Sequence, residues 1–230
     1  MSTIEQNYQA IQQRMAAACQ KSQRPESTVS LLAVSKTKPA SAVQACYQLG
    51  QRSFGENYLQ DAETKLDALA ELTDIEWHFI GPLQSNKTRT VAERFQWLET
   101  LDRPKIAKRL NEQRPAHLPL LNVLIQVNIS GEEQKAGLTP EQVPTFATEL
   151  SSLTRLRLRG LMCIPEATED ETRLAHQFQQ MKLLFDQLAE QFDSVDTLSM
   201  GMSSDLELAI ASGSTQVRIG TDIFGARAAK

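Results

Sequence analysis

Lys36 occupies a position where a lysine is costly. It directly follows residues 29–35, a nearly continuous apolar run that is typical of a strand buried on both faces. A strongly hydrated ammonium is disfavoured there unless its surroundings engage the nitrogen or favour the neutral amine. A neutral lysine amine can attack an aldehyde and form a Schiff base. The alternative is a lysine that extends to solvent from a strand end. The position of Lys36 in the sequence, taken alone, favours extension to solvent, and the position of Lys38 favours it more strongly.

Two turns rich in small residues come late in the chain and could hold an anion. Residues 199–207 include Gly201, which lets the backbone approach a bound group. In the same segment Ser204 and Glu207 have the spacing of a helix capping box, so a plainly capped helix is the alternative. Residues 217–225 follow the last predicted strand. Phosphate sites of (β/α)8 barrels often lie in the loops after strands seven and eight, so the two turns together favour a phosphorylated ligand.

Arg218 is expected to point into the mouth of a barrel. It shares side-chain parity with Gln216 and Gly220, opposite two apolar neighbours. A buried guanidinium needs an acceptor. The candidates are a ligand phosphate, a ring nitrogen or a structural carboxylate such as Glu56.

The histidines do not indicate a metal site. His78, His117 and His176 lack the spacing of metal ligands, and no cysteine or carboxylate pattern completes a set. We expect no metal. We also expect His78 to be a packed, hydrogen-bonded strand residue rather than an acid or base, and we assign no catalytic residue. The sequence contains neither a Gly-x-Ser-x-Gly elbow nor a Walker loop.

A regular alternation of strands and helices must position these residues. Strands are predicted near residues 29–35, 52–55, 75–81, 95–101, 121–129, 157–164, 195–200 and 215–220. Helices are predicted near residues 4–21, 39–50, 57–71, 86–93, 103–113, 140–151, 170–192 and 204–212. Strict alternation of this kind requires parallel pairing of the strands.

Eight strands favour an α/β fold closed as a (β/α)8 TIM barrel, with one domain over residues 1–230. An open doubly wound sheet is the alternative, but the first strand-to-helix turn has no Gly-x-Gly-x-x-Gly fingerprint. Few residues follow the last strand. The opening helix, near residues 4–21, is therefore an extra N-terminal helix that we expect to fill the gap in the outer ring.

Composition excludes several classes of protein. The chain has 230 residues, 41% of them hydrophobic and 23% charged, which is ordinary for a globular domain. A net charge of −4 argues against nucleic acid or an anionic membrane as partner, so we expect a small-molecule ligand. The three cysteines, Cys19, Cys46 and Cys163, are few and widely spaced, as free thiols of a reducing compartment are. Because there is no signal peptide or long apolar run, we expect a cytoplasmic protein.

Several long motifs resemble one known family. They are residues 31–37 (LLAVSKT), 54–58 (FGENY), 78–87 (HFIGPLQSNK), 160–162 (GLM), 198–203 (LSMGMS) and 217–221 (VRIGT). In this order, and over nearly the whole chain, they are similar to the pyridoxal phosphate homeostasis proteins, the YggS/PROSC family. The resemblance implies binding of pyridoxal 5′-phosphate (PLP) on a single fold-type III barrel, similar to the N-terminal domain of alanine racemase.

The resemblance also implies a set of cofactor-binding residues. By that likeness Lys36 carries PLP as a Schiff base. The remaining residues implied are Asn57, Met162, Ser199, Met202, Ser203, Arg218, Gly220 and Thr221. Among them Ser199, Gly220 and Thr221 would hold the phosphate, with Met202 and Ser203 nearby, while Asn57 and Met162 would line the ring. Arg218 would contact either the ring nitrogen or the phosphate.

Asp222 departs from the family pattern. Family members more often carry a small apolar residue in this turn, and a carboxylate turned toward a phosphate would repel it. We therefore expect Asp222 to point to solvent.

The resemblance implies a protein of PLP and vitamin B6 homeostasis rather than an enzyme. A fold-type III racemase needs a second acid or base opposite the lysine, which a C-terminal domain and a dimer partner provide in alanine racemases. We expect a monomer that binds PLP, keeps its free concentration low and passes it to PLP-dependent apoenzymes.

Two alternatives stay open. One is a PLP-dependent amino-acid racemase or lyase with weak activity. The other is an aldolase-type barrel in which Lys36 attacks a sugar carbonyl without a cofactor; such a protein would be colourless.

Overall fold

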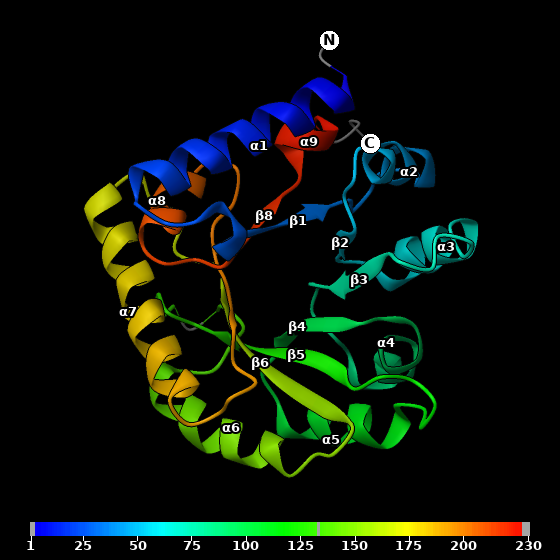
Figure 1. Cartoon of the computed structure of the whole chain (residues 1–230). Helices are drawn as coiled ribbons and strands as arrows, with labels where there is room; N and C mark the ends of the chain where they lie inside the picture. Colours follow the sequence, from blue (N-terminus) through cyan, green and yellow to red (C-terminus); the bar gives the residue numbers. More distant parts are fainter. Residues whose placement is uncertain (1–2, 133, 227–230) are drawn as a thin grey trace.

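The apolar runs of the sequence form the inner wall of a closed barrel. The computed structural model describes residues 3–132 and 134–226. Its strands are β1 (Ser30–Val34), β2 (Ser53–Glu56), β3 (Glu76–Phe79), β4 (Trp97–Leu101), β5 (Leu121–Val127), β6 (Leu156–Cys163), β7 (Thr197–Ser199) and β8 (Gln216–Ile219). Each pairs in parallel with the next, and β1 pairs with β8 to close the ring. The predicted (β/α)8 barrel is confirmed (Figure 1).

Helices on the outside return the chain between successive strands. The α-helices are α1 (Ile4–Lys21), α2 (Ala40–Gln48), α3 (Leu59–Ala68), α4 (Thr88–Arg94), α5 (Pro104–Gln113), α6 (Val143–Ser151), α7 (Glu171–Ala189), α8 (Leu206–Ala211) and α9 (Thr221–Phe224). Three 3-10 turns precede β1, α4 and α6: η1 (Glu26–Thr28), η2 (Ser85–Lys87) and η3 (Pro140–Gln142). Only α9 was not predicted, because a single helical turn is too short to show an apolar period.

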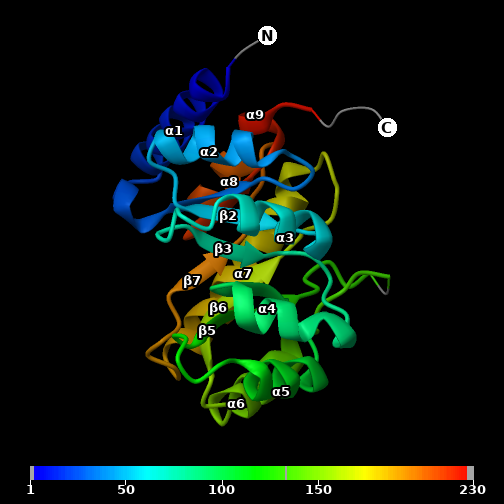
Figure 2. The ribbon, with the colours of Figure 1, turned by 90° about the vertical axis from the view of Figure 1, so that its right-hand side faces the viewer.

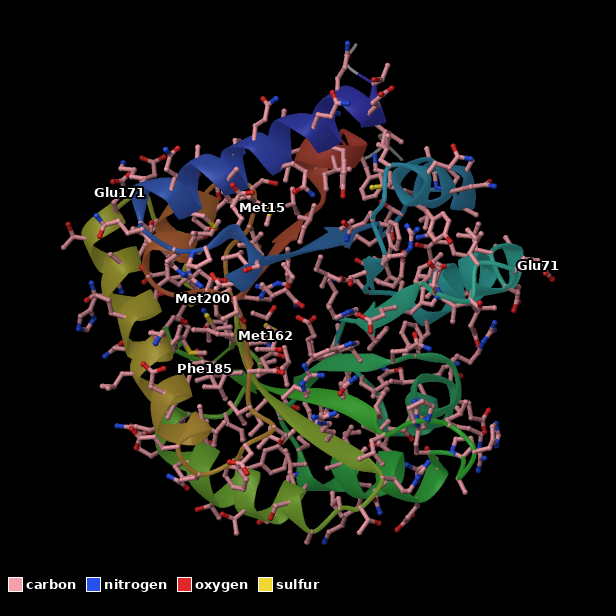
Figure 3. The ribbon with its side chains drawn as sticks, in the orientation of Figure 1. Met15, Glu71, Met162, Glu171, Phe185 and Met200 are labelled. Carbon is pink, nitrogen blue, oxygen red and sulfur yellow. The ribbon has the colours of Figure 1, made fainter. Side chains whose placement is uncertain are left out.

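The opening helix fills the gap in the outer ring, as predicted. A capping box of Thr3 and Gln6 begins α1, and its apolar residues Ile11 and Met15 are buried. Figure 3 shows Met15 on the inner side of this helix. Figures 1 and 2 show α1 lying along α8 and α9, which it contacts. The side chain of Asn7 donates a hydrogen bond to the carbonyl oxygen of Ile223, at 3.0 Å.

The apolar core has two parts. Most of it lies between the strands and the surrounding helices, as expected for strands covered on their outer face. A smaller cluster of Trp97, Leu124 and Met162 lies apart from the main core. Within the described residues no helix has the length and apolar character needed to cross a membrane.

The three cysteines are buried and free. Burial raises the pKa of the Cys46 thiol to about 12, and it also raises that of Cys163 to about 12. Neither is therefore a thiolate near neutral pH, and the prediction of free thiols is confirmed.

Candidate functional site

A cavity of about 340 Å³ opens at the carboxyl ends of the strands. Its lining residues are Val34, Lys36, Lys38, Asn57, Ile80, Met162, Ile164, Met202, Ser203, Ser204, Arg218, Gly220, Thr221 and Gly225. Eight of the nine predicted cofactor-binding residues are among them, and Ser199 is not. The loops after β7 and β8 form one side of the cavity, as the phosphate-site argument predicts for this fold.

Lys36 lies at the mouth of the cavity, directly after β1. Its side chain is half-buried. The chain turns sharply here, because the N–H of Lys38 donates to the carbonyl oxygen of Ser35 at 3.0 Å and Thr37 has a φ of 64°. The turn places Lys36 at the same cavity as Arg218.

Lys38 is more constrained than predicted. Its ammonium donates to the carbonyl oxygens of Gly225 and Ala226, at 2.9 and 2.8 Å. The prediction that Lys38 simply extends to solvent was wrong, because the segment after α9 folds back over the first strand-to-helix turn and supplies acceptors.

Arg218 points into the barrel, as its parity in β8 predicts. It is only 6% exposed. Its guanidinium donates to the hydroxyl of Ser199 and to the carbonyl oxygen of Cys163, both at 2.8 Å. Glu56, the structural carboxylate considered as its partner, bonds to Lys65 instead at 2.7 Å. Both of these acceptors are uncharged, and no carboxylate of the described residues bonds directly to Arg218.

Ser199 stands behind the cavity rather than in its wall. It is fully buried in β7, and its hydroxyl donates to Glu99 at 2.7 Å while accepting from Arg218. Ser199 is therefore not among the lining residues of the described cavity. The family resemblance implied Ser199 as a cofactor-binding residue, but it does not show how deep along the barrel axis this side chain lies.

A buried polar network continues from Ser199 across the barrel interior. Glu99 accepts from Gln216 at 2.6 Å, and His78 Nδ1 lies 2.7 Å from the same carboxylate. The ring of His78 also stacks on Trp97, with centroids 4.9 Å apart. The prediction of a packed, hydrogen-bonded His78 is confirmed. Sequence reasoning missed Glu99 and Gln216, although an acidic residue within an apolar strand is a recognisable signal of an interior polar site.

Glu99 remains ionised within this network. Burial alone would raise the pKa of Glu99, but the hydrogen bond and charge of His78, the charge of Arg218 and the hydrogen bond from Ser199 outweigh burial and lower it. An ionised Glu99 accepts hydrogen bonds only, so Nδ1 of His78 carries a hydrogen and donates it to Glu99.

The loop after β7 differs from the predicted capping box. The helix α8 has Asp205 as its N-cap, and the Asp205 carboxylate accepts from the N–H of Met202 at 2.5 Å. Glu207 pairs with Arg14 of α1, at 2.8 Å. The alternative interpretation, a capping box of Ser204 and Glu207, is not what the structure shows, because Glu207 forms a long-range ion pair instead.

Gly201 allows the loop to turn at this point. Its φ is +99°, and a Cβ atom there would lie 2.5 Å from the Cβ of Ala209. The next two residues, Met202 and Ser203, then line the cavity. The close approach of this loop to α8 therefore depends on glycine.

Two further observations show what the cavity could accept. Asn57 lines the cavity, and its Oδ1 is buried with no hydrogen-bond partner among the described residues. Thr221 begins α9, and an N–H in the first turn of a helix has no acceptor within it. Together with Lys36 and Arg218, these groups suit a small anion that also carries a group able to interact with an amide.

Asp222 turns away from the cavity but does not simply face solvent. Its carboxylate pairs with Arg14 at 3.0 Å, and the side chain is 37% exposed. It is not a lining residue of the described cavity. The expectation of a purely solvated carboxylate is corrected by this ion pair.

The described residues contain no cluster of three or more histidine, cysteine or acidic side chains that could hold a metal ion. The chemical capacity of the site is therefore that of an amine, a guanidinium and nearby amide and hydroxyl donors. This set can bind a small molecule that has both a carbonyl carbon and an anionic group.

Comparisons with known proteins agree with this description. The family model for the alanine racemase N-terminal domain matches residues 2–228. The chain is 53% identical over 227 residues to the pyridoxal phosphate homeostasis protein of Haemophilus influenzae, covering 97% of this chain and 96% of that protein. It is 51% identical over 229 residues to the pyridoxal phosphate homeostasis protein of Escherichia coli K12, covering 99% and 98%.

A solved structure is similar over almost the same length. PipY of Synechococcus elongatus PCC7942, with PLP bound, superimposes with a TM-score of 0.80 at 36% identity, covering 94% of this chain and 100% of PipY. The similarity thus includes the whole barrel.

Proposed function

The chain belongs to the alanine racemase N-terminal domain family and, within it, to the pyridoxal phosphate homeostasis proteins, and we propose that it binds PLP and takes part in PLP homeostasis. The observation that carries the proposal is the placement of Lys36 and Arg218 at one cavity, with six other predicted residues. The structure of PipY, which is similar to this chain over its whole length, has been solved with PLP bound.

The residues present fit this cofactor. When bound, PLP supplies a reactive aldehyde on an aromatic ring that also bears a phosphate. Lys36 is the amine that would capture the aldehyde as a Schiff base. Ser203, Gly220 and Thr221 would hold the phosphate from the loops after β7 and β8, where backbone N–H groups can face it.

Arg218 is proposed to face the ring rather than the phosphate. It lies two residues before Gly220 on β8, which places it about 7 Å deeper along the strand. That separation suits a phosphate at the rim and a ring below it. Asn57 and Met162 would flank the ring from the ends of β2 and β6. Ser199 is not proposed as a ligand, because it contacts Arg218 from behind.

We also propose that the protein binds PLP without acting as a catalyst. Racemisation needs an acid–base group on each face of the substrate. The second amine of the described cavity wall, that of Lys38, donates to two backbone carbonyls. Arg218 cannot act as a base because a guanidinium stays protonated. These groups suit retention of the cofactor and its delivery to apoenzymes.

We further propose that the protein acts as a monomer in the cytoplasm. The ring of helices is closed within one chain by α1, and three buried free thiols suit a reducing compartment. Light scattering of the purified protein would test the first point. A dimer that persists at nanomolar concentration would contradict it.

Borohydride reduction of the PLP-loaded protein, followed by peptide mapping, tests the proposed function. We expect the label on Lys36, and we expect Lys36→Ala to remove the visible absorption band and weaken PLP binding. Lys182→Ala, on the exposed face of α7, is the control. A label on another side chain, or an unchanged Lys36→Ala protein, would overturn the proposal.

Delivery and catalysis need separate measurements. The loaded protein should activate a PLP-dependent apoenzyme faster than the same total concentration of PLP bound to an unrelated protein. Steady turnover of any amino acid in a broad panel would show instead that the protein is an enzyme.

A further inference from the structure

A buried ion cluster contacts the backbone on both sides of Lys36. Its centre is the ammonium of Lys65, on α3, whose side chain is only 2% exposed. This ammonium donates to the carbonyl oxygen of Ser35 at 2.8 Å, to Glu56 at 2.7 Å and to Asp61 at 2.8 Å. An ammonium has three N–H donors, so its full capacity is used within the cluster.

The cluster bonds to the peptide groups on both sides of Lys36. The ammonium of Lys65 engages the carbonyl oxygen of Ser35, the residue before Lys36. The carboxylate of Asp61 accepts from the N–H of Thr37, the residue after it, at 2.9 Å. The hydroxyl of Ser35 donates to Glu56 at 2.5 Å. The cluster therefore acts on the backbone that carries Lys36.

Thr37 shows why the turn needs this support. Its φ of 64° lies in the left-handed region, which a β-branched side chain rarely adopts without help from its surroundings. The bond to Asp61 and the turn bond from Lys38 to Ser35 hold the chain in this conformation. Without them, an extended or right-handed Thr37 would redirect Lys36.

The same cluster also reaches the cavity wall at the end of β2, the strand that pairs with β1. Glu56 is the last residue of β2 and precedes Asn57, a lining residue. Burial raises the pKa of Glu56, while the charge and hydrogen bond of Lys65 act to lower it. A buried ion pair is a weak source of stability compared with apolar packing. Its clearest effect here is to fix geometry.

We infer that Lys65, Asp61 and Glu56 form a clamp that positions the amine of Lys36 for reaction with an aldehyde. The inference rests on the proposed function, in which Lys36 is the reacting amine. Lys65 and Asp61 are positioning residues, since they act on the backbone around Lys36 and are not among the lining residues of the described cavity.

The first experiment uses the protein without cofactor. Amide hydrogen exchange at Thr37 is measured in the wild type, Asp61→Ala and Asp61→Asn. The side chain of Asp61 is 36% exposed, so both variants are expected to fold. We expect protection of the Thr37 amide to fall about tenfold in Asp61→Ala, with partial recovery in Asp61→Asn, which keeps an acceptor oxygen. Unchanged protection would contradict the clamp.

The second experiment measures the rate at which added PLP produces the visible absorption band. Since misplacement of a reacting group by about 1 Å can cost 100-fold in rate, we expect Asp61→Ala and Lys65→Met to react about 10- to 100-fold more slowly. Borohydride mapping should still place the label on Lys36. Wild-type rates in both folded variants would overturn the inference.

Two controls separate the possible failures. Lys182→Met breaks an exposed lysine–aspartate pair of the same i,i+4 spacing on α7, and it should react at the wild-type rate. Should Lys65→Met fail to fold, Asp61→Ala decides alone. Unaltered PLP capture by Lys36→Ala would refute the proposed function, whereas loss in Lys36→Ala with normal rates in the clamp variants would refute only the clamp.

Discussion

Arg218 donates a hydrogen bond to the hydroxyl of Ser199 at 2.8 Å. That hydroxyl donates onward to Glu99 at 2.7 Å. The direction of these bonds makes Ser199 a connector between a cation in the cavity wall and an anion in the barrel interior. It also explains why a serine and not an alanine is needed here, since alanine would leave a buried guanidinium and a buried carboxylate each short of a partner.

Ser199→Ala and Ser203→Ala should affect ligand binding differently. Ser203 lines the cavity near the proposed phosphate position, so its loss should weaken PLP more than pyridoxal, which has no phosphate. Ser199→Ala should weaken both ligands by a similar factor, because it disturbs Arg218. It should also cost about 1–3 kcal/mol of stability through the unpartnered groups. Titrations with the two ligands and urea unfolding provide the measurements. A phosphate-selective effect of Ser199→Ala would show that it is a phosphate ligand after all.

The lowered pKa of Glu99 predicts that part of the folding stability is lost in acid. Its pKa is lowered on folding, so the stability it contributes is fully present above its ordinary value of 4.5. This contribution is lost as the pH falls through the still lower pKa of the folded state. In Glu99→Gln the decline in unfolding free energy below about pH 4.5 should be shallower. Urea unfolding at several pH values measures this. Parallel curves for the two proteins would contradict the assignment.

Asp222→Ala should leave PLP affinity unchanged or slightly weaker. The carboxylate pairs with Arg14 rather than facing the cavity, so its removal relieves no repulsion. Because the pair is partly exposed, its loss should cost at most about 1 kcal/mol of stability. Absorbance titration with PLP checks the affinity. A sharply tighter complex would mean that Asp222 does act on the phosphate.

Gly201→Ala should both destabilise the protein and impair the cavity. The substitution strains a φ of +99° and drives a Cβ into Ala209, which together should cost about 2 kcal/mol or more. Gly50→Ala is a matched control, since its φ is +101° but nothing lies within 4 Å of the added Cβ. The control should lose only about 1 kcal/mol and bind PLP normally. Equal losses in the two variants would show that the contact with Ala209 relaxes freely.

The sequence predicted the elements well because each has a clear apolar period. The first helix was predicted with its observed bounds, Ile4–Lys21, and all eight strands occur where expected. Eight of the nine cofactor-binding residues that the family resemblance implies line the cavity. Two of them, Lys36 and Arg218, were also indicated by their places at strand ends, which meet at one face of a parallel barrel.

Interactions between distant segments were not predictable in the same way. The partner of Glu207 is Arg14, 193 positions away, and a local capping box was the simpler interpretation of its spacing. The burial of Lys65 was not predictable either. Helix periodicity does not distinguish an exposed lysine from one that reaches a carboxylate on the preceding strand, as Lys65 reaches Glu56. The depth of Ser199 likewise depends on the stagger of the strands, which no single segment encodes.

The placement of α1 has a consequence for biosynthesis. Asn7 is bonded to Ile223, 216 positions later in the chain, and Arg14 to Asp222, 208 positions later. On the ribosome, α1 can meet α2 early, but its contacts with α8 and α9 form only after almost the entire polypeptide has emerged. Nascent chains should therefore leave the face of α1 that packs on α8 and α9 exposed during most of elongation. Chaperones could bind this face, and its packing should be the last step in closing the ring of helices.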